Sequence, residues 1–196
     1  AVKDMVQNHL LQVLSIVAME EPKEEGSRGI HDSQFNLLSK LVPITNVNDS
    51  LVMAQYEGYL DEENISKDSK TETYAALKLF IDNERWQGVP FFIRTGKKMG
   101  DRETQIVVQF KAVGDIPGNV LIIKIQPDEG VYFQFNAKKP GTEQELQQIS
   151  LDFCQSCILE NRINTPEAYE RLLDACFKGD HALFSQWDQI VVSWTF

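Results

Sequence analysis

Apolar residues recur at steps of three and four over residues 2–19, and this spacing predicts an amphipathic α-helix. Its apolar stripe consists of Val6, Leu10, Val13, Leu14 and Val17. We expect the helix to end near Met19, because Pro22 and a polar run over residues 23–29 follow it. A second, short helix is predicted over residues 31–41.

The middle of the chain changes to short runs of alternating or continuous apolar residues, which predict strands. The predicted strands cover residues 51–60, 71–82, 90–95, 105–111, 120–125, 131–135 and 146–153. Short polar or Gly- and Pro-containing loops join most of them, and short connections favour antiparallel neighbours. The sequence therefore predicts a large, mainly antiparallel sheet.

Helical signals return towards the C-terminal end. Thr165 and Pro166 fit the N-cap and the first position of a helix that runs to Lys178, where a glycine follows. Short helices are predicted over residues 180–187 and 188–194. The order of helices, strands and helices predicts an α+β fold in which the helices pack on one face of the sheet.

Length, composition and charge limit the class of protein. A chain of 196 residues with 42% hydrophobic residues fits one globular domain over residues 1–196. The net charge of −10 argues against nucleic acid or an anionic membrane as partner, and no apolar run is long enough to span a bilayer. The helix pattern begins almost at once, without an initiator Met or a signal peptide. We therefore expect a truncated part of a longer, cytoplasmic protein.

His9 lies in the amphipathic helix and has two interpretations. One is a half-buried histidine bonded to a neighbour, and the other is a general base, because imidazole titrates near neutral pH. Asp4 precedes His9 by five positions, so an α-helix would place the two about 140° apart and they would not stack on one face. Both can still flank a ligand that lies across the helix start.

A basic cluster stands out in this acidic chain. It consists of Arg94, Lys97, Lys98 and Arg102, with Asp101 as the only acid among them. The cluster indicates either a small anionic ligand or a solvated turn between strands. Gln126 is a further polar candidate, because it stands just beyond the strand predicted over residues 120–125.

The cysteines do not indicate a metal or redox centre. Cys154, Cys157 and Cys176 form an odd count in a chain without secretory features, which fits a reducing compartment. Cys154 and Cys157 have CxxC spacing, but zinc would need two further ligands, and a redox motif would open a helix rather than follow a strand pattern. We interpret the cysteines as structural or incidental and expect no metal. The sequence also has no P-loop, GxGxxG or serine-elbow motif.

Longer segments of the chain, in order and over nearly its whole length, match one known family. They are DMVQNHLLQ (residues 4–12), AMEEP (18–22), QYEGYL (55–60), TETYAALKLFIDNERWQGVPFFIRTGKKM (71–99), IQPDEGVY (125–132), KKPG (138–141) and PEAYERLLDACFKGDHALF (166–184). Together these segments resemble the glucose-6-phosphate dehydrogenase family. The long central block is the most specific part of the resemblance.

The resemblance implies roles for five residues. His9 stands where the family has its general base, which takes the proton from the C1 hydroxyl of the sugar as hydride leaves C1 for the nicotinamide. Asp4, Lys97, Arg102 and Gln126 match positions that contact the substrate, glucose 6-phosphate, whose phosphate suits fixed cations. The resemblance thus implies an oxidoreductase of the pentose phosphate pathway that yields 6-phosphoglucono-lactone and uses NADP.

Two parts of the family pattern are missing from these residues. One is the Rossmann coenzyme domain, and the other is an RIDHYLGK-type segment that supplies phosphate ligands and the carboxylate that orients the histidine. We therefore expect the C-terminal substrate-binding and dimerisation domain, with NADP bound by an N-terminal domain outside this chain and no activity for the fragment alone. The family's sheet forms its subunit interface, which implies a homo-oligomer. The alternative is a non-catalytic sugar-phosphate-binding or oligomerisation module.

Some members of the family bind a second, structural NADP on this domain. Arg94 and Tyr132 match positions of that site, but Glu103 and Val107 stand where basic residues are expected. An acid facing a 2′-phosphate is unfavourable, so we expect no such site here.

Overall fold

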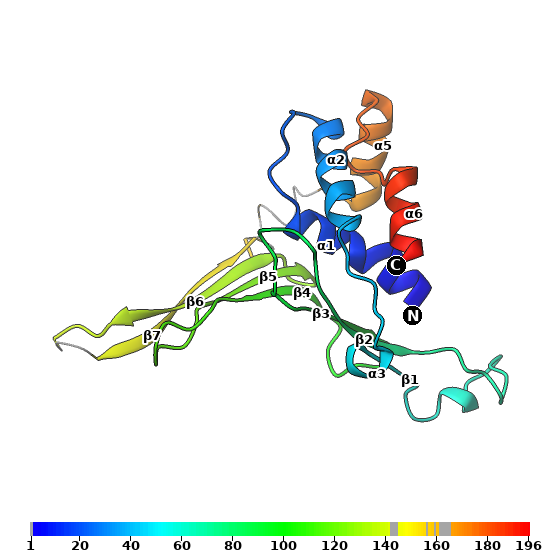
Figure 1. Ribbon diagram of the computed structural model, residues 1–196, viewed down its shortest axis with the longest axis horizontal. Coiled ribbons are helices and arrows are strands. Elements are labelled where there is room, and N and C mark those ends of the chain that lie inside the picture. The colour runs from blue at the N-terminus through cyan, green and yellow to red at the C-terminus, as the bar shows by residue number, and fades with distance from the viewer. Residues whose placement is uncertain (1, 142–144, 156, 159, 161–165) are drawn as a thin grey trace. The chain divides into compact units, whose positions relative to one another are not determined.

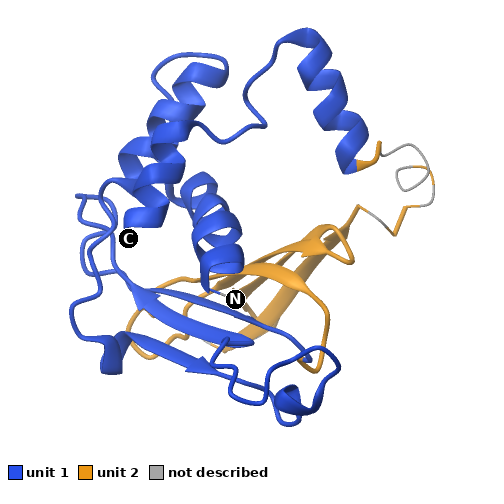
Figure 2. Ribbon diagram, turned by 90° about the vertical axis from the view of Figure 1, so that its right-hand side faces the viewer, with its two compact units in different colours: residues 1–98, 168–196 blue, residues 99–167 orange. Residues whose placement is uncertain are grey.

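The computed structural model describes residues 2–141, 145–155, 157–158, 160 and 166–196. They belong to two compact units (Figure 2). Unit 1 is made of Ala1–Lys98 and Ala168–Phe196, and unit 2 is Met99–Glu167.

Unit 1 combines a three-stranded antiparallel sheet with helices (Figure 1). Its strands are β1 (Leu51–Ala54), β2 (Tyr74–Leu79) and β3 (Phe91–Gly96), with β2 in the centre. Its helical elements are η1 (Val2–Leu10), α1 (Leu11–Ala18), α2 (Ser27–Leu38), α3 (Val47–Ser50), η2 (Tyr59–Asp61), α5 (Ala168–Lys178) and α6 (Trp187–Thr195). Helices α1, α2 and α6 lie on one side of this sheet, as predicted.

The core of unit 1 forms where β2 meets the helices. Side chains of β2 alternate between half-buried and buried, and the buried ones are Ala75, Leu77 and Leu79. They share one cluster with apolar residues of η1, α1 and α2, namely Val6, Leu11, Leu14, Ala18, Leu37 and Leu38. Removing this apolar surface from water is what holds the helices to the sheet.

A buried chain of hydrogen bonds joins three helices inside unit 1. The Gln189 amide of α6 donates to Gln34 Oε1 at 3.1 Å and to the carbonyl of His31 at 3.2 Å, both on α2. Gln34 Nε2 in turn donates to Ser15 Oγ on α1 at 3.2 Å. Because buried polar groups cost free energy unless they are bonded, this chain favours one relative register of α1, α2 and α6.

The first helix is a π-helix up to Leu10 and an α-helix from Leu11 onward. Its predicted end near Met19 is confirmed, because α1 ends at Ala18. The predicted stripe needs a correction: Val6 is followed in the core by Leu11, five positions on, while Leu10 is only half-buried. The reason is that π-helical hydrogen bonds join residue i to residue i+5, so residues five apart stack on one side.

Unit 2 is a four-stranded antiparallel meander. Its strands, in spatial order, are β4 (Thr104–Gln109), β5 (Val120–Gln126), β6 (Gly130–Lys138) and β7 (Leu146–Cys154). Side chains of paired residues lie on the same face, and the register places two apolar rows on one of the two faces. The rows are Ile106, Ile123, Val131 and Phe153, and Val108, Leu121, Phe133 and Leu151. We call this surface the apolar sheet face.

The end of β7 carries the CxxC pair. Cys154 and Cys157 form a disulfide, and Cys176 on α5 is free and exposed. The sequence left structural and incidental roles open for the cysteines and did not predict this pairing.

The α+β class and the antiparallel strands are confirmed, with three local corrections. The strands form two sheets rather than one. The strand predicted over residues 51–60 ends at Ala54, and the chain then turns through Gly58, whose φ of 82° suits glycine. Residues 180–186 are turns and coil instead of a short helix. The predicted N-cap Thr165 lies outside the described residues, and α5 begins at Ala168.

Candidate functional site

Asp4 and His9 lie side by side on η1. His9 Nε2 is 3.8 Å from Asp4 Oδ1. The prediction that these side chains do not stack is therefore wrong, because it assumed an α-helix, whereas a π-helix stacks residues five apart. At 3.8 Å the atoms are too far apart for a hydrogen bond but close enough to attract each other when the imidazole is protonated.

Both side chains of this pair are open to a ligand. His9 is 58% exposed and Asp4 is 75% exposed, so His9 differs from the half-buried, bonded histidine that the pattern also allowed. The opposite side of η1 is fixed, because Val6 lies in the core. An exposed imidazole on an anchored helix, with a carboxylate beside it, can accept a proton from a bound ligand.

Lys97 lies in the turn that follows β3. Its N–H donates to the carbonyl of Thr73 at 2.9 Å. Thr73 is only 3% exposed, so the backbone of the turn is tied to a buried residue. The Lys97 side chain is exposed, and within the described part of the chain its ammonium has no hydrogen-bond or ion-pair partner. It is a cation that a ligand can reach.

Two adjacent residues, Glu72 and Thr73, join the His9 helix to the Lys97 turn. The N–H of Val2, at the start of η1, donates to Glu72 Oε1 at 2.9 Å. This hydrogen bond is the main reason why the pKa of Glu72 is lowered. Because Thr73 accepts from Lys97, the helix and the turn are both held by one short segment of unit 1, and η1 also packs against β3.

The other two predicted residues lie in unit 2. Gln126 ends β5 and pairs with Thr104, the first residue of β4. Arg102 precedes Thr104 by two positions, so Arg102 and Gln126 come to the same end of the β4–β5 pair. Both are exposed, and the Gln126–Pro127 peptide is cis. Asp4, His9 and Lys97 are thus held by one short segment of unit 1, whereas Arg102 and Gln126 lie at one end of the β4–β5 pair in unit 2.

A cluster of Tyr56, Glu62 and Lys98, which we call the Lys98 cluster, was not predicted as part of the site. Lys98 Nζ forms an ion pair with Glu62 and lies 4.5 Å from the centre of the Tyr56 ring, and Tyr56 Oη donates to Glu62 Oε1 at 3.2 Å. The hydrogen bond from Lys98 lowers the pKa of Glu62 and raises that of Lys98, while partial desolvation and then Glu62 raise the pKa of Tyr56. The signal for this cluster was weak in sequence, because Glu62 and Lys98 are 36 positions apart.

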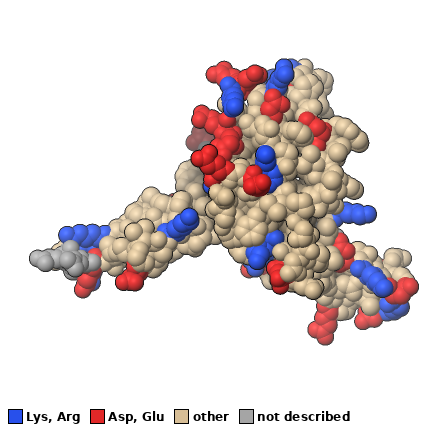
Figure 3. Space-filling view, viewed as in Figure 1, with Lys and Arg blue, Asp and Glu red and all other residues tan. Residues whose placement is uncertain are grey.

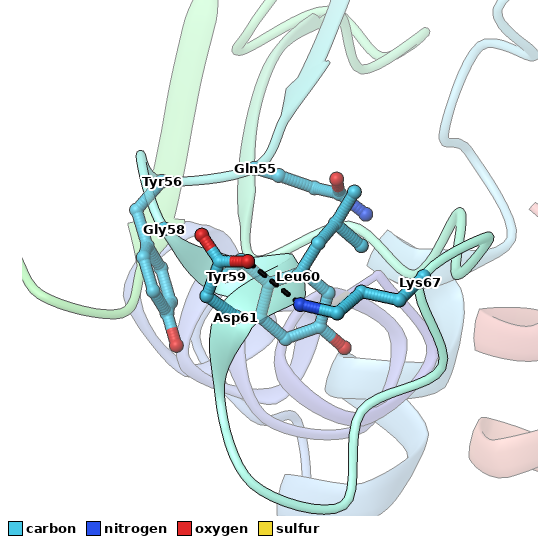
Figure 4. A pocket seen from close by; sticks show the side chains of 7 residues that line it. All are labelled: Gln55, Tyr56, Gly58, Tyr59, Leu60, Asp61 and Lys67. Carbon is cyan, nitrogen blue, oxygen red and sulfur yellow. Dashed lines mark hydrogen bonds and ion pairs between the residues drawn. The ribbon is translucent and has the colours of Figure 1, made fainter.

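The loop that carries Tyr56 and Glu62 encloses a hollow of about 470 Å³ (Figure 4). Its lining residues are Gln55, Tyr56, Gly58, Tyr59, Leu60, Asp61 and Lys67. Lys67 Nζ contacts Asp61 Oδ1 at 2.7 Å, and Gln55 donates to two carbonyls of the same loop. None of the site residues predicted from the sequence lines this hollow.

The positions that match a structural NADP site are spread over both units. Arg94 lies on β3 in unit 1. In unit 2, Val107 and Tyr132 share one face of the sheet, and Glu103 accepts a hydrogen bond from Gln105.

Several other kinds of site have no support among the residues that the structure describes. They contain no group of three or more His, Cys, Asp or Glu side chains arranged to hold a metal ion. No described helix combines the length and the apolar character needed to cross a membrane. On the face drawn in Figure 3, basic and acidic side chains are interspersed over the helices.

Comparisons with known proteins point to one family over the whole chain. Residues 1–196 match the family described as Glucose-6-phosphate dehydrogenase, C-terminal domain. The glucose-6-phosphate 1-dehydrogenase of Bacillus subtilis is 42% identical, over 100% of this chain and 44% of that protein. The enzyme of the same name from Dictyostelium discoideum is 41% identical, over 98% of this chain and 41% of that protein.

Solved structures agree with this match. A glucose-6-phosphate dehydrogenase in complex with its substrate glucose-6-phosphate has a TM-score of 0.90 and 39% identity, over 99% of this chain and 42% of that chain. The glucose-6-phosphate 1-dehydrogenase of Mycobacterium avium has a TM-score of 0.79 and 34% identity, also over 99% of this chain and 42% of that chain. The chain thus spans less than half the length of the relatives it matches.

Proposed function

Because this chain belongs to the glucose-6-phosphate dehydrogenase C-terminal domain family, we propose that it is the substrate-binding part of a dehydrogenase. That enzyme oxidises glucose 6-phosphate at C1 to 6-phosphoglucono-lactone and uses NADP. The observation that carries the proposal is that one short segment of unit 1 holds both an exposed histidine–carboxylate pair and a lysine without a partner in the described part of the chain. The chain that carries them matches this family over residues 1–196.

His9 is the residue we assign to proton transfer. Oxidation of the C1 hydroxyl removes a proton from oxygen and a hydride from carbon, and the imidazole of His9 accepts the proton. The positive charge that then forms on His9 lies 3.8 Å from Asp4 Oδ1, which favours it electrostatically. Asp4 also has a free face for a sugar hydroxyl, because its side chain is 75% exposed.

Lys97, Arg102 and Gln126 are the residues we assign to the rest of the substrate. A phosphate ester carries nearly two negative charges, so it gains most from cations that are not already paired. The Lys97 ammonium meets that condition within the described part of the chain, whereas Lys98 is engaged with Glu62. The guanidinium of Arg102 and the amide of Gln126 supply directional hydrogen bonds at the end of β4 and β5.

NADP accepts the hydride when it is bound, and these 196 residues carry no Gly-rich fingerprint for it. The residues that match the second, structural site do not fit either, because Val107, on the same face of the sheet as Tyr132, is apolar and Glu103 is acidic. We therefore propose that the coenzyme is bound by residues outside this chain. Hydride transfer requires both reactants to be held in contact, so the purified 196-residue chain should not reduce NADP.

We also propose that the protein is a homo-oligomer that associates through its sheet. The supporting observation is the apolar sheet face, where Phe153 and Leu151 are 54% and 62% exposed in the single chain. The second candidate function is a non-catalytic oligomerisation or sugar-phosphate-binding module, and the apolar sheet face suits the oligomerisation role equally well. The two candidates differ in one respect: only the enzyme reduces NADP.

We place the protein in the cytoplasm. This placement rests on a relative, because the Cys154–Cys157 disulfide removes the support that the cysteines gave to a reducing compartment. One relative, from Arabidopsis thaliana, is named as a cytoplasmic enzyme, with 38% identity over 98% of this chain.

The test of the proposed function is an initial-rate assay of the full-length protein. With NADP, glucose 6-phosphate should support NADPH formation, and glucose should support far less because it lacks the phosphate that Lys97 and Arg102 bind. Equal rates with both sugars would contradict the assigned phosphate site. Binding of glucose 6-phosphate without any NADPH formation would favour the non-catalytic module.

A further inference from the structure

The backbone of Lys98 adopts a conformation that a residue with a side chain rarely takes. Its φ is 52°, in the left-handed region that glycine favours. Such a conformation persists when surrounding contacts fix it. The contacts here come from the Lys98 side chain, which binds the Glu62 carboxylate and lies over the Tyr56 ring.

The loop that supplies these contacts is itself anchored beneath the Lys97 turn. The Tyr56 N–H donates to Thr73 Oγ1 at 2.9 Å, and the Thr73 N–H donates to the carbonyl of Ala54, also at 2.9 Å. The Thr73 carbonyl accepts from the N–H of Lys97. One buried threonine therefore fixes both the loop with Tyr56 and the turn with Lys97.

Two adjacent lysines in this turn have different surroundings. Lys98 is held on one side by Glu62 and Tyr56, while the Lys97 side chain is exposed and has no partner in the described part of the chain. Fixing the backbone at Lys98 limits the directions in which the preceding side chain can point. Without the Lys98 cluster, the turn would populate further conformations, and only a fraction of them would present Lys97 correctly.

We propose that Tyr56, Glu62 and Lys98 act as positioning residues that hold the turn in the conformation in which Lys97 meets the phosphate of the substrate. The inference rests on the proposed function, because it takes Lys97 as a ligand of glucose 6-phosphate. The three residues do not touch the substrate; they act through Lys97.

The same loop offers a matched control. Lys67 and Asp61 form an ion pair of the same kind at 2.7 Å, and both belong to the loop that surrounds the hollow in Figure 4. Among the described residues, neither side chain forms a hydrogen bond or ion pair with the turn that carries Lys97. Asp61 is also the direct neighbour of Glu62. If loosening the loop were the only effect, breaking either ion pair should change the KM for glucose 6-phosphate equally.

The experiment compares variants of the full-length protein in an NADPH-forming assay. Glu62→Gln and Lys98→Met should raise the KM for glucose 6-phosphate by roughly two- to fivefold, the range by which an exposed ion pair biases an equilibrium. The kcat and the KM for NADP should change by less than that. Asp61→Asn and Lys67→Met should leave all three values unchanged, and Lys98→Arg, which keeps the charge and the ring contact, should restore the parental KM.

A double variant separates positioning from general destabilisation. If the Lys98 cluster acts through Lys97, then Glu62→Gln should have no further effect on the KM once Lys97→Met is in place. If the role of the cluster were purely structural, the effects of Glu62→Gln and Lys97→Met on the KM would add. Additive effects, or an Asp61→Asn variant that matches Glu62→Gln, would overturn the inference.

The outcome for Lys97→Met alone distinguishes this inference from the function it rests on. If Lys97→Met does not raise the KM for glucose 6-phosphate, the assignment of Lys97 as a phosphate ligand fails. If Lys97→Met raises the KM and Glu62→Gln does not, the phosphate site stands and the positioning role of the Lys98 cluster is refuted.

Discussion

Replacing Lys97 by methionine should weaken substrate binding in the full-length protein without destabilising its fold. The side chain is exposed and has no partner in the described part of the chain, so its loss should change the free energy of unfolding by less than about 0.5 kcal/mol. A hydrogen bond to a charged group contributes about 1.5–3 kcal/mol. At about 1.4 kcal/mol for each factor of ten, the KM for glucose 6-phosphate should rise roughly 10- to 100-fold.

The assay is the initial rate of NADPH formation as glucose 6-phosphate is varied, at low and at raised ionic strength. Salt screens an exposed cation, so the KM of the parent protein should rise with salt, and that of Lys97→Met should rise less. Lys67→Met, which removes another exposed lysine of unit 1, is the control and should keep the parental KM. A rise of less than about threefold for Lys97→Met would refute the reasoning, because one ion–phosphate contact is expected to contribute more.

Three further predictions concern the fold and the assembly. Leu11→Ala, at a fully buried position, should lower the free energy of unfolding by about 2–5 kcal/mol in urea titrations, whereas Ile16→Ala, at a 59% exposed position, should change it by less than about 0.5 kcal/mol. Leu151→Lys should shift sedimentation of the full-length protein towards the monomer, and an unchanged oligomer would exclude the apolar sheet face as the interface. Glu72 has a folded-state pKa below its ordinary value of 4.5, so its stabilisation is present above that pH and lost as the pH falls through the folded pKa. Glu72→Gln should therefore be less stable than the parent at neutral pH, and the difference should shrink as the pH falls below 4.5. A difference that stays constant down into acid would contradict this account.

The elements that could be predicted are those whose signal is local. The period of residues 2–19 and the break at Pro22 were enough to predict the first helix and its end. The π-helical stretch could not be predicted in this way, because Val6 and Leu10 satisfy the α-helical spacing equally well. Which of Leu10 and Leu11 is buried depends on how η1 packs against β3 and the helices, and that is a tertiary effect.

The division of the strands into two sheets could not be predicted from the sequence either. Each strand carries a strand pattern, but nothing in its own residues says which neighbour it pairs with. The strand predicted over residues 51–60 failed beyond Ala54 because the chain turns at Gly58, which was taken as part of the strand.

The residues of the candidate site could be selected from the sequence, and their roles stay predictions, whereas the geometry could not be predicted. The type and spacing of residues were enough to select His9 and the basic cluster around Lys97, and the resemblance gave them roles. The contact between Asp4 and His9 was missed, since it exists only in a π-helix. Glu62 was missed because it joins the turn through an ion pair across 36 positions of sequence.

The central claim is that His9 is the general base, and the most direct measurement is the turnover of His9→Asn in the full-length protein. Asparagine keeps a polar side chain at this exposed position but cannot take up the proton. We expect kcat to fall by roughly 10²- to 10⁴-fold, while the affinity for glucose 6-phosphate stays within a few fold of the parent. Near-normal turnover of His9→Asn would contradict the account, whatever its effect on binding.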